Sequence, residues 1–319
     1  MIKDAFRQEI KDIARDAVQT TVTLLKIMIP VSIAVKIFQE TGMIEAVGSA
    51  LAPVMELVGL PGGYGLVWAT AMITNIYGGM VVFFSLVTES PLTVAQVTVL
   101  GAMILVAHTL PVEVGIAREA GVQVWFTLLL RILGGFVLGG ILHGIFTLGD
   151  IYDTPAVILW SPGVRDDSLL FWAVGQVKMY VMIFVIITFL LLLMRILKKT
   201  GVISRVNMLL EPVLHTLGIG KEAAPLAMIG LTMGLAYGGG LIIREAKSGF
   251  LGKRDVFLSL SLMGLSHSLI EDTLLMVAIG ASLMGILVGR IVFTFVLMML
   301  LIRCLRHVST PVFDRFFVR

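Results

Sequence analysis

The stretch His267-Ser268-Leu269-Ile270-Glu271-Asp272 places a histidine and two acids inside a long apolar run, residues 256–284. A related stretch, His108-Thr109-Leu110-Pro111-Val112-Glu113, begins 159 residues earlier in another apolar run. Ionisable side chains are costly inside a membrane, and they generally mark substrate or ion pathways there. We call the two stretches the histidine–acid motifs, and we treat them as the first candidates for function.

The composition is that of a polytopic membrane protein. Of the 319 residues, 58% are hydrophobic and only 14% are charged, whereas soluble domains contain about 25% charged residues. The single cysteine, Cys304, excludes an internal disulfide and any site built from several cysteines. The sequence has no P-loop, hydrolase nucleophile motif or zinc-protease helix, so we expect no enzyme activity, no cofactor and no nucleic-acid partner.

Matching residues recur at an offset of 159 and indicate an internal duplication. The pairs in this register are Lys36/Arg195, Thr41/Thr200, Gly42/Gly201, Pro53/Pro212, Gly59/Gly218, His108/His267, Leu110/Leu269, Glu113/Asp272 and Arg131/Arg290. One extra residue in the second half aligns Tyr77-Gly78-Gly79 with Tyr237-Gly238-Gly239. So many rare polar residues in one register exceed what chance would give, and we therefore predict two repeats.

The apolar pattern divides the chain into five predicted segments. They are an amphipathic N-terminal helix on the membrane surface (1–19), a first repeat (20–147), an extracytoplasmic linker (148–168), a second repeat (169–303) and a basic cytoplasmic tail (304–319). A solvated leader helix is the alternative for residues 1–19. We expect an integral protein of a bacterial inner membrane, with both termini in the cytoplasm.

The lysines and arginines predict how the chain is oriented. The basic stretches, expected inside, are 1–19, 194–255 and 303–319, and the acidic stretches, expected outside, are 37–93 and 147–168. On this assignment residues 62–88 and 222–250 each begin and end on one side of the membrane. We therefore predict re-entrant hairpins that turn near Tyr77–Gly79 and Tyr237–Gly240, where glycine permits a tight reversal.

The expected fold class is an all-α polytopic membrane protein of two inverted repeats. Each repeat has three transmembrane helices, an interfacial helix and a re-entrant hairpin, a plan found in many secondary transporters. Eight plain spans in parallel repeats are the alternative. The alternative is disfavoured because it would put the basic stretches 195–205 and 244–254 on opposite sides.

Candidate substrate-binding residues lie in the hairpins and in the histidine–acid motifs. They are Asn75, Tyr77, Gly78, Gly79, His108, Glu113, Tyr237, Gly238, Gly239, Gly240, His267, Glu271 and Asp272. On a helix, His267 and Glu271 share a face because they are four residues apart. In the first motif Pro111 breaks the helix between His108 and Glu113, which could bring both side chains into one cavity.

Each of these residue types also has a structural interpretation. The acids could form buried ion pairs with Arg131 and Arg290, which would hold the two halves together, and we expect this role for the arginines. The glycines could serve close helix packing instead of contacting a solute.

The duplicated unit is an amphipathic helix, a glycine-tipped hairpin and a helix with His-[Ser/Thr]-Leu followed by an acid. It resembles the Gate, or nucleoside-recognition, domain of concentrative nucleoside transporters, bacterial ferrous-iron transporters and spore-maturation membrane proteins. The resemblance covers roughly residues 20–303 and implies inverted repeats around a central site. It implies a site built from residues 75–79, 108–113, 237–240 and 267–272, and it leaves a homo-oligomer open.

We expect a secondary transporter of a small polar or anionic solute, such as a nucleoside-like compound. Glu113, Glu271 and Asp272 would couple transport to H⁺ or Na⁺, and the expected partners are the lipid bilayer and the solute or ion. One alternative is a divalent metal-ion permease with His108 and His267 among the ligands. Another is a non-transporting membrane partner, or a carrier of lipid-linked phosphate that uses the two arginines.

Overall fold

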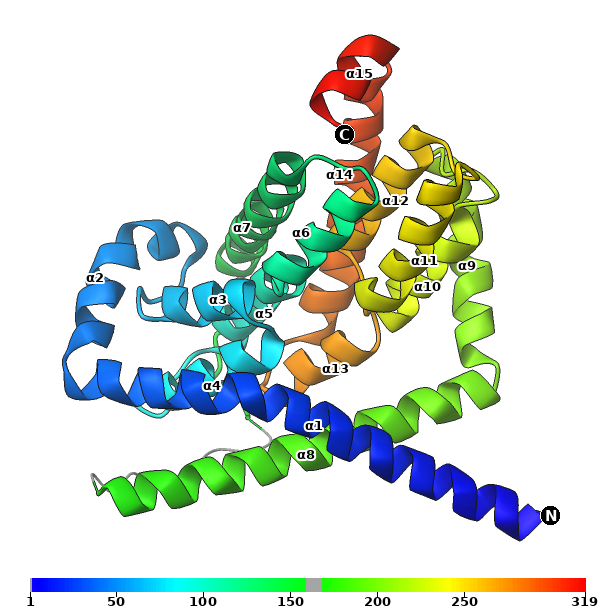
Figure 1. Ribbon diagram of the computed structural model, residues 1–319. Coiled ribbons are helices and arrows are strands. Elements are labelled where there is room, and N and C mark those ends of the chain that lie inside the picture. The colour runs from blue at the N-terminus through cyan, green and yellow to red at the C-terminus, as the bar shows by residue number, and fades with distance from the viewer. Residues whose placement is uncertain (1, 159–167) are drawn as a thin grey trace.

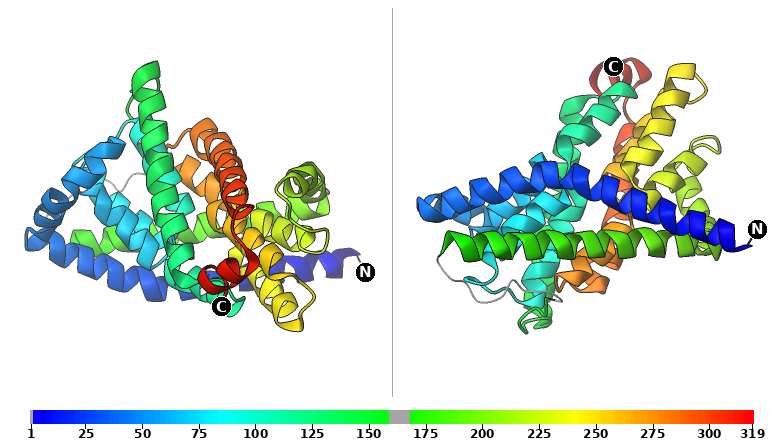
Figure 2. Two further views of the ribbon diagram at one scale, coloured as in Figure 1. Left: turned by 90° about the horizontal axis from the view of Figure 1, so that it is seen from above. Right: turned by 60° about the horizontal axis from the view of Figure 1, so that its bottom comes forward.

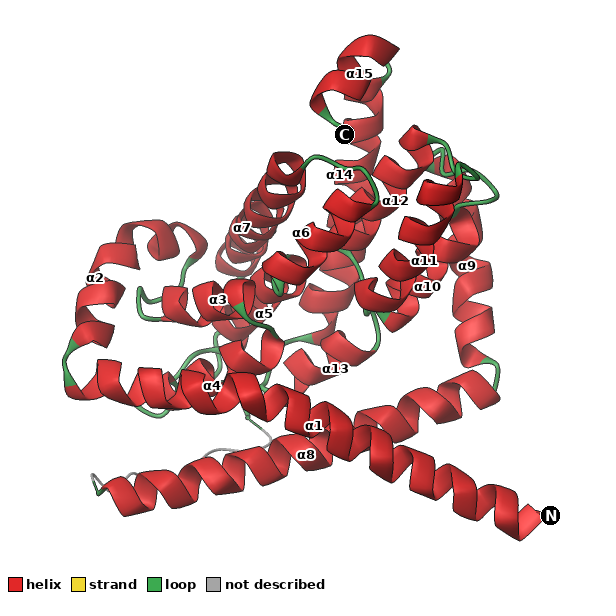
Figure 3. Cartoon of the chain, in the orientation of Figure 1, coloured by secondary structure: helices red, strands yellow, loops and turns green. Residues whose placement is uncertain are grey.

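The computed structural model describes residues 2–158 and 168–319. In this part of the chain the regular structure is helical, and only isolated bridges join Thr93 to Pro155 and Val122 to Val318 (Figure 3). The expectation of an all-α protein is therefore confirmed.

The first half begins with a long helix and a short one. The elements are α1 (Ile2–Glu40), α2 (Met43–Met55), the 3-10 turn η1 (Glu56–Val58), α3 (Tyr64–Ile73), α4 (Ile76–Leu86), α5 (Val94–Val106), α6 (Leu110–Glu119) and α7 (Val124–Gly149). The helices α3 and α4 pack on each other as a pair, and α5 and α6 are two parts of one interrupted helix.

The second half has the same order of elements. They are α8 (Leu169–Lys199), α9 (Val202–Thr216), α10 (Ala224–Met233), α11 (Leu235–Ser248), α12 (Lys253–Leu265), α13 (Glu271–Ala278), the π-helical turn η2 (Met284–Gly289), α14 (Arg290–Leu305) and the terminal α15 (Thr310–Phe316). Glycines with positive φ recur at the offset of 159: Gly42, Gly59 and Gly121 match Gly201, Gly218 and Gly280. The duplicated sequence thus places left-handed turns at matching points of both halves.

Five helical segments are long and apolar enough to cross a membrane. They are Lys11–Glu40, Val94–Glu119, Val124–Gly149, Leu169–Lys199 and Met284–Leu305. A sixth predicted span, 256–279, is divided between α12 and α13, and neither part is as long as a membrane is thick. By composition and helix length the chain is an integral membrane protein.

The structure adds detail to the two predicted terminal segments. Residues 1–19 are not a separate element, because α1 continues without a break from Ile2 to Glu40. No glycine or proline precedes Pro30 to end the helix. The tail is also ordered, since α15 follows α14 and buries Phe313. Of the predicted linker, residues 159–167 lie outside the part that is described.

The helices form a central body with two long helices across one side. In Figures 1 and 2, α1 and α8 cross each other, and α1 packs on α4 of this body. The body packs α5 against α7, and α12 against both α7 and α14. Almost all of α5 is buried, so the core of the protein lies around it. The two motif histidines sit at the ends of α5 and α12, within this core.

Candidate functional site

The site forms where two helices are interrupted. The helix α5 ends at Val106 and α6 begins at Leu110, while α12 ends at Leu265 and α13 begins at Glu271. Thr109 (φ 52°) and Ser268 (φ 47°) occupy matching positions in the breaks, both in the left-handed region. Residues other than glycine are uncommon there, and such strain is concentrated at functional sites.

Each break is held by the end of a hairpin helix. The backbone N–H of Thr109 donates to the carbonyl of Ala71 at 2.9 Å, and that of Leu269 donates to Leu231 at 2.8 Å. These carbonyls belong to the last turns of α3 and α10. The hairpin pairs therefore fix the backbone that carries the two histidines, and buried backbone groups that would be left unpaired find partners.

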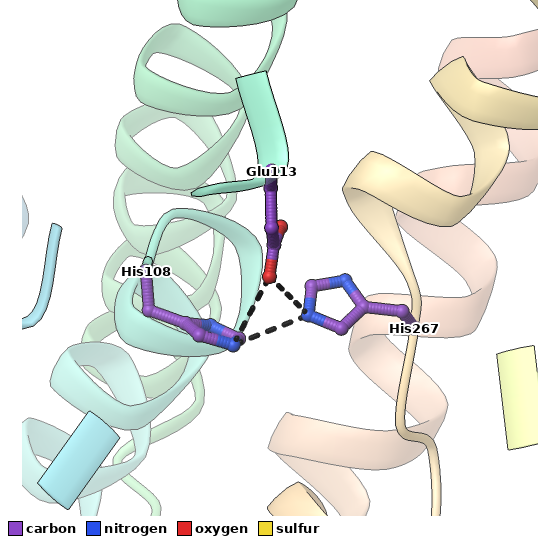
Figure 4. Close-up of side chains that lie close together, drawn as sticks. All are labelled: His108, Glu113 and His267. Atoms are coloured by element: carbon purple, nitrogen blue, oxygen red, sulfur yellow. Dashed lines mark hydrogen bonds and ion pairs between the residues drawn. The ribbon is translucent and has the colours of Figure 1, made fainter. Parts of the chain in front are cut away.

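The two histidines, one from each half, point their Nε2 atoms toward each other (Figure 4). His108 Nε2 lies 3.1 Å from His267 Nε2. Each Nδ1 lies against the backbone carbonyl four residues earlier, that of Ile104 at 2.9 Å and that of Met263 at 2.8 Å. Their relative exposures are 5% and 2%, so both rings are shielded from solvent.

This arrangement determines the histidine tautomers. A carbonyl oxygen only accepts hydrogen bonds, so each Nδ1 must carry the hydrogen. In a neutral ring the other nitrogen, Nε2, then offers only a lone pair. Two lone pairs would face each other at 3.1 Å between His108 and His267. A cation between the rings, either a metal ion or a proton, converts this repulsion into attraction.

Glu113 completes the cluster from the start of α6. Its Oε1 lies 3.2 Å from Nε2 of His267 and 3.8 Å from Nε2 of His108. Its Oε2 forms an ion pair with Arg131, whose Nε donates to the carbonyl of Val106 at 2.9 Å. Arg131 is fully buried, and its position on α7 holds Glu113 toward the histidines. The predicted ion pair between this acid and Arg131 is present.

The three donor atoms have the spacing of a metal site. His108 Nε2, His267 Nε2 and Glu113 Oε1 form a triangle with sides of 3.1, 3.2 and 3.8 Å. A point about 2.0 Å from all three atoms lies at its centre, which matches the Zn–N and Zn–O bond lengths of proteins. Among the described residues, this is the group of His, Cys, Asp and Glu side chains that could hold a metal ion.

The second half contributes its acids differently. Asp272 Oδ2 lies 3.7 Å from Nε2 of His108, so it is close enough to join the cluster. Glu271 is half-buried and makes no hydrogen bond or ion pair within the described ranges. Arg290 is fully buried and donates to the carbonyls of Leu105 (3.5 Å) and His267 (3.3 Å). No carboxylate of the described chain lies within 4 Å of Arg290, so the predicted ion pair is not formed there.

The hairpins turn earlier than the sequence suggests. In the first, the chain reverses at Thr74 and Asn75, and the Asn75 side chain accepts a hydrogen bond from Gly78 N at 2.9 Å, capping α4. In the second it reverses at Gly234, where φ is 101°. Gly234 therefore stands at the N-cap position that Asn75 occupies in the first half. The site is asymmetric at this point.

Most of the glycines that follow the turns serve helix packing. A Cβ on Gly79 would lie 2.8 Å from that of Ala71, and one on Gly238 would lie 2.6 Å from Gly230 Cα. A Cβ on Gly239 would clash with Ile116, whereas one on Gly240 would meet nothing within 4 Å. Close approach of α3 to α4 and of α10 to α11 explains Gly79 and Gly238 without any solute, and contact with α6 explains Gly239, whereas packing does not explain Gly240. Tyr77 lies in the first turn of α4, and the side chain of Tyr237 lies outside the described part.

Sequence reasoning missed the backbone carbonyls of Ile104 and Met263. The sequence does contain a pattern that could identify them. Each carbonyl lies four residues before a histidine at a helix end, where the last carbonyls have no partner in the helix. A histidine in that place can donate to one of them and leave its other nitrogen for a ligand.

Comparisons with known proteins support the predicted resemblance. The Gate family, described as nucleoside recognition, matches residues 180–286, which include the second histidine–acid motif. The uncharacterized membrane protein YvoD of Bacillus subtilis (strain 168) is 28% identical over 280 residues, covering 86% of this chain and 87% of that protein. No solved structure matches significantly. The resemblance to Gate-domain membrane proteins is thus confirmed, and it indicates a transporter-like function.

Proposed function

We propose that this protein is a membrane transporter whose central site binds a divalent transition-metal ion as its substrate. His108, His267 and Glu113 are the ligands, and Asp272 lies nearby as a further oxygen donor. The observation that carries the proposal is the pair of Nε2 lone pairs, 3.1 Å apart, facing each other beside a carboxylate. A buried site of this kind is stabilised by a cation.

The donor set favours a transition metal over Mg²⁺ or Ca²⁺. Imidazole nitrogens suit Zn, Cu, Fe and Ni, whereas Mg²⁺ and Ca²⁺ prefer oxygen ligands. Histidines that bind metals usually donate their other N–H to a carbonyl or carboxylate, which fixes the ring and its tautomer. The carbonyls of Ile104 and Met263 provide this support for His108 and His267.

We propose that the two halves are inverted and that α3–α4 and α10–α11 are re-entrant hairpins. The support is that corresponding helices begin at opposite ends of the body. The start of α5 bonds to the stretch around Pro155, since Val94 N donates to Thr154 O at 2.9 Å. The start of α12 lies instead at the end that holds the C-terminus, where Lys253 pairs with Asp314 at 3.0 Å. The basic tail at that end favours the cytoplasmic side, as expected from its charge.

A second candidate function is transport of a small polar or anionic solute, coupled to H⁺ or Na⁺. The family description, nucleoside recognition, favours it. A proton shared by His108 and His267 would also resolve the facing lone pairs, and Glu271 offers a half-buried carboxylate without a partner among the described residues. In this version Glu113, Glu271 and Asp272 would carry the coupling ion.

The geometry does not favour a carrier of lipid-linked phosphate. That function needs guanidinium groups that a phosphate can reach. Arg131 and Arg290 are both fully buried, and Glu113 already neutralises Arg131.

The proposal is tested by measuring metal binding to the purified protein in detergent. We expect stoichiometric binding of Zn²⁺ or Fe²⁺ by calorimetry or elemental analysis, and loss of most of it in His267→Ala. The matched control is His215→Ala, because the His215 side chain is 42% exposed and lies on α9, outside the cluster. Unchanged metal binding in a folded His267→Ala protein would contradict the metal function.

The same preparations distinguish the second candidate. Vesicles containing the protein are tested for uptake of the metal ion and, in parallel, of nucleosides driven by a pH or Na⁺ gradient. Nucleoside uptake that is abolished by Glu271→Gln with Asp272→Asn, in a protein that binds no metal, would favour the coupled solute transporter.

A further inference from the structure

A cavity of about 580 Å³ lies between the end of α9 and the length of α14, away from the central site. Its wall is apolar and is formed by α14 residues between Phe295 and Ile302. At one end the lining changes to Arg303, Arg306 and His307, with Thr216 of α9 opposite. The cavity thus has an apolar body and a basic mouth.

The basic mouth is not neutralised by the protein. Neither Arg303 nor Arg306 nor His307 forms an ion pair within the described ranges, and all three residues are exposed. The nearby carbonyl of Leu305 already accepts a hydrogen bond from Arg254 at 2.6 Å. Two guanidinium groups and an imidazole are therefore available to an anion from outside the chain.

The apolar wall is open toward the lipid. Val296, Met299 and Leu300 are 50%, 42% and 55% exposed. They belong to Met284–Leu305, one of the segments long and apolar enough to span the bilayer. The basic side chains stand where this apolar segment ends, which is the depth at which lipid phosphates lie.

We propose that this cavity binds an anionic glycerophospholipid. The phosphate would lie on Arg303, Arg306 and His307, and the acyl chains would follow the apolar wall of α14. Basic pockets between membrane helices at the cytoplasmic face are known to select anionic head groups. A soluble phosphate would use the mouth but would gain nothing from the open apolar wall, so the lipid is favoured.

The basic mouth is not a by-product of the duplication. At the offset of 159, the first half has Gly144, Thr147 and Leu148 where the second has Arg303, Arg306 and His307. These three basic side chains therefore occur in the second half without counterparts in the first, as expected for a site that binds lipid from one leaflet of the bilayer.

The test compares lipids on the full-length protein in a neutral detergent. We expect phosphatidylglycerol to remain bound in native mass spectrometry and to raise the unfolding temperature, with little effect of phosphatidylcholine. The variant Arg303→Gln with Arg306→Gln should weaken phosphatidylglycerol binding roughly thirty-fold, since each basic residue near anionic lipid contributes about 1 kcal/mol. The control is Arg205→Gln with Lys221→Gln, which removes the same charge from exposed positions outside the cavity.

Three results would overturn the proposal. They are equal binding of phosphatidylglycerol to the double variant and to the control, equal retention of phosphatidylcholine, and stabilisation by inorganic phosphate that matches stabilisation by phosphatidylglycerol. The last result would indicate a site for a soluble anion. The binding assay does not depend on the solute carried, so it can fail or succeed independently of the central site.

Discussion

Glu113 and Asp272 occupy matching positions in the two halves, yet they differ by one methylene. The longer Glu113 reaches both Arg131 and the histidines. The shorter Asp272 lies 3.7 Å from His108, and Arg290 donates to backbone carbonyls instead. The cluster is therefore asymmetric, because one of the two carboxylates pairs with an arginine and the other does not within the described chain.

The ion pair of Glu113 with Arg131 gives a prediction about stability. Glu113→Gln leaves a fully buried guanidinium without its counter-ion, and breaking a buried pair in this way costs about 3–5 kcal/mol. We expect a clearly lower unfolding temperature in detergent than for Glu56→Gln, whose side chain is exposed. Combining Glu113→Gln with Arg131→Met should recover part of the loss. Equal unfolding temperatures for the two single variants would show that the pair contributes nothing.

The sequence predicts most of the site residues but not how they pair. Offset and intramembrane position identify His108, His267 and the acids, because buried ionisable groups are rare and conspicuous. That the two Nε2 atoms meet depends on how the halves pack, which no local pattern encodes. For the same reason the sequence predicts ion pairs for both arginines, whereas only Arg131 forms one in the described chain.

At the scale of elements, α6 of the first half lies against α11 of the second. Gly239 faces Ile116, and Lys247 of α11 pairs with Glu119 at the end of α6 at 2.7 Å. The Glu119 end of this contact lies near the C-terminal residue, since Arg319 N donates to Gly121 O. If one half moves against the other during transport, this contact must open and close.

A disulfide across the contact tests that movement. A Cβ on Gly239 would lie 3.6 Å from Cβ of Ile116, within the range of disulfides. In a Cys304→Ser background, Gly239→Cys with Ile116→Cys should cross-link on oxidation, and uptake should fall and return on reduction. The control pair, Gly240→Cys with Ile116→Cys, should not cross-link, because a Cβ on Gly240 meets nothing within 4 Å. Full uptake by the cross-linked protein would mean that this contact stays closed.

The type and order of the helices can be predicted from the sequence, whereas some helix boundaries and turn positions cannot. Apolar length and the repeat predict the paired helices, and Pro111 predicts the break in the first motif. The break between Leu265 and Glu271 has no proline to mark it, so the expected helix face shared by His267 and Glu271 is wrong. The sequence predicts the first reversal near Tyr77–Gly79, whereas the chain reverses at Thr74–Asn75, because glycine is typical both of turns and of close helix packing. The continuity of α1 was missed because a change of composition near residue 19 is not a helix break.

At the scale of the whole molecule, the C-terminal helix joins parts of both halves. Phe313 and Phe317 of the terminal segment contact Phe257 of α12, and Phe317 contacts Phe126 of α7. The terminal segment predicted as a basic tail therefore packs on both halves through Phe313 and Phe317, and we call these contacts the aromatic clasp. The two phenylalanines are four residues apart and share a helix face, but the charges of the segment dominate its sequence pattern.

The clasp predicts a stability difference within one helix. Phe313→Ala removes a side chain that is 5% exposed, and such truncations of buried phenylalanine cost about 3–5 kcal/mol. Phe316→Ala is the matched control, since that residue is 51% exposed. Thermal unfolding in detergent should separate the two variants by several degrees. Indistinguishable curves would show that α15 contributes no stability to the body.

The contact between the histidine rings also bears on ancestry. If a single repeat preceded the duplicated gene, two identical copies of it would have met about a twofold axis, and His108 and His267 mark where that axis passed. The ancestral homodimer would already have possessed both imidazole ligands, one from each subunit. Fusion of the copies would then have allowed the two acids to diverge into glutamate and aspartate, a divergence that no symmetric dimer can accumulate.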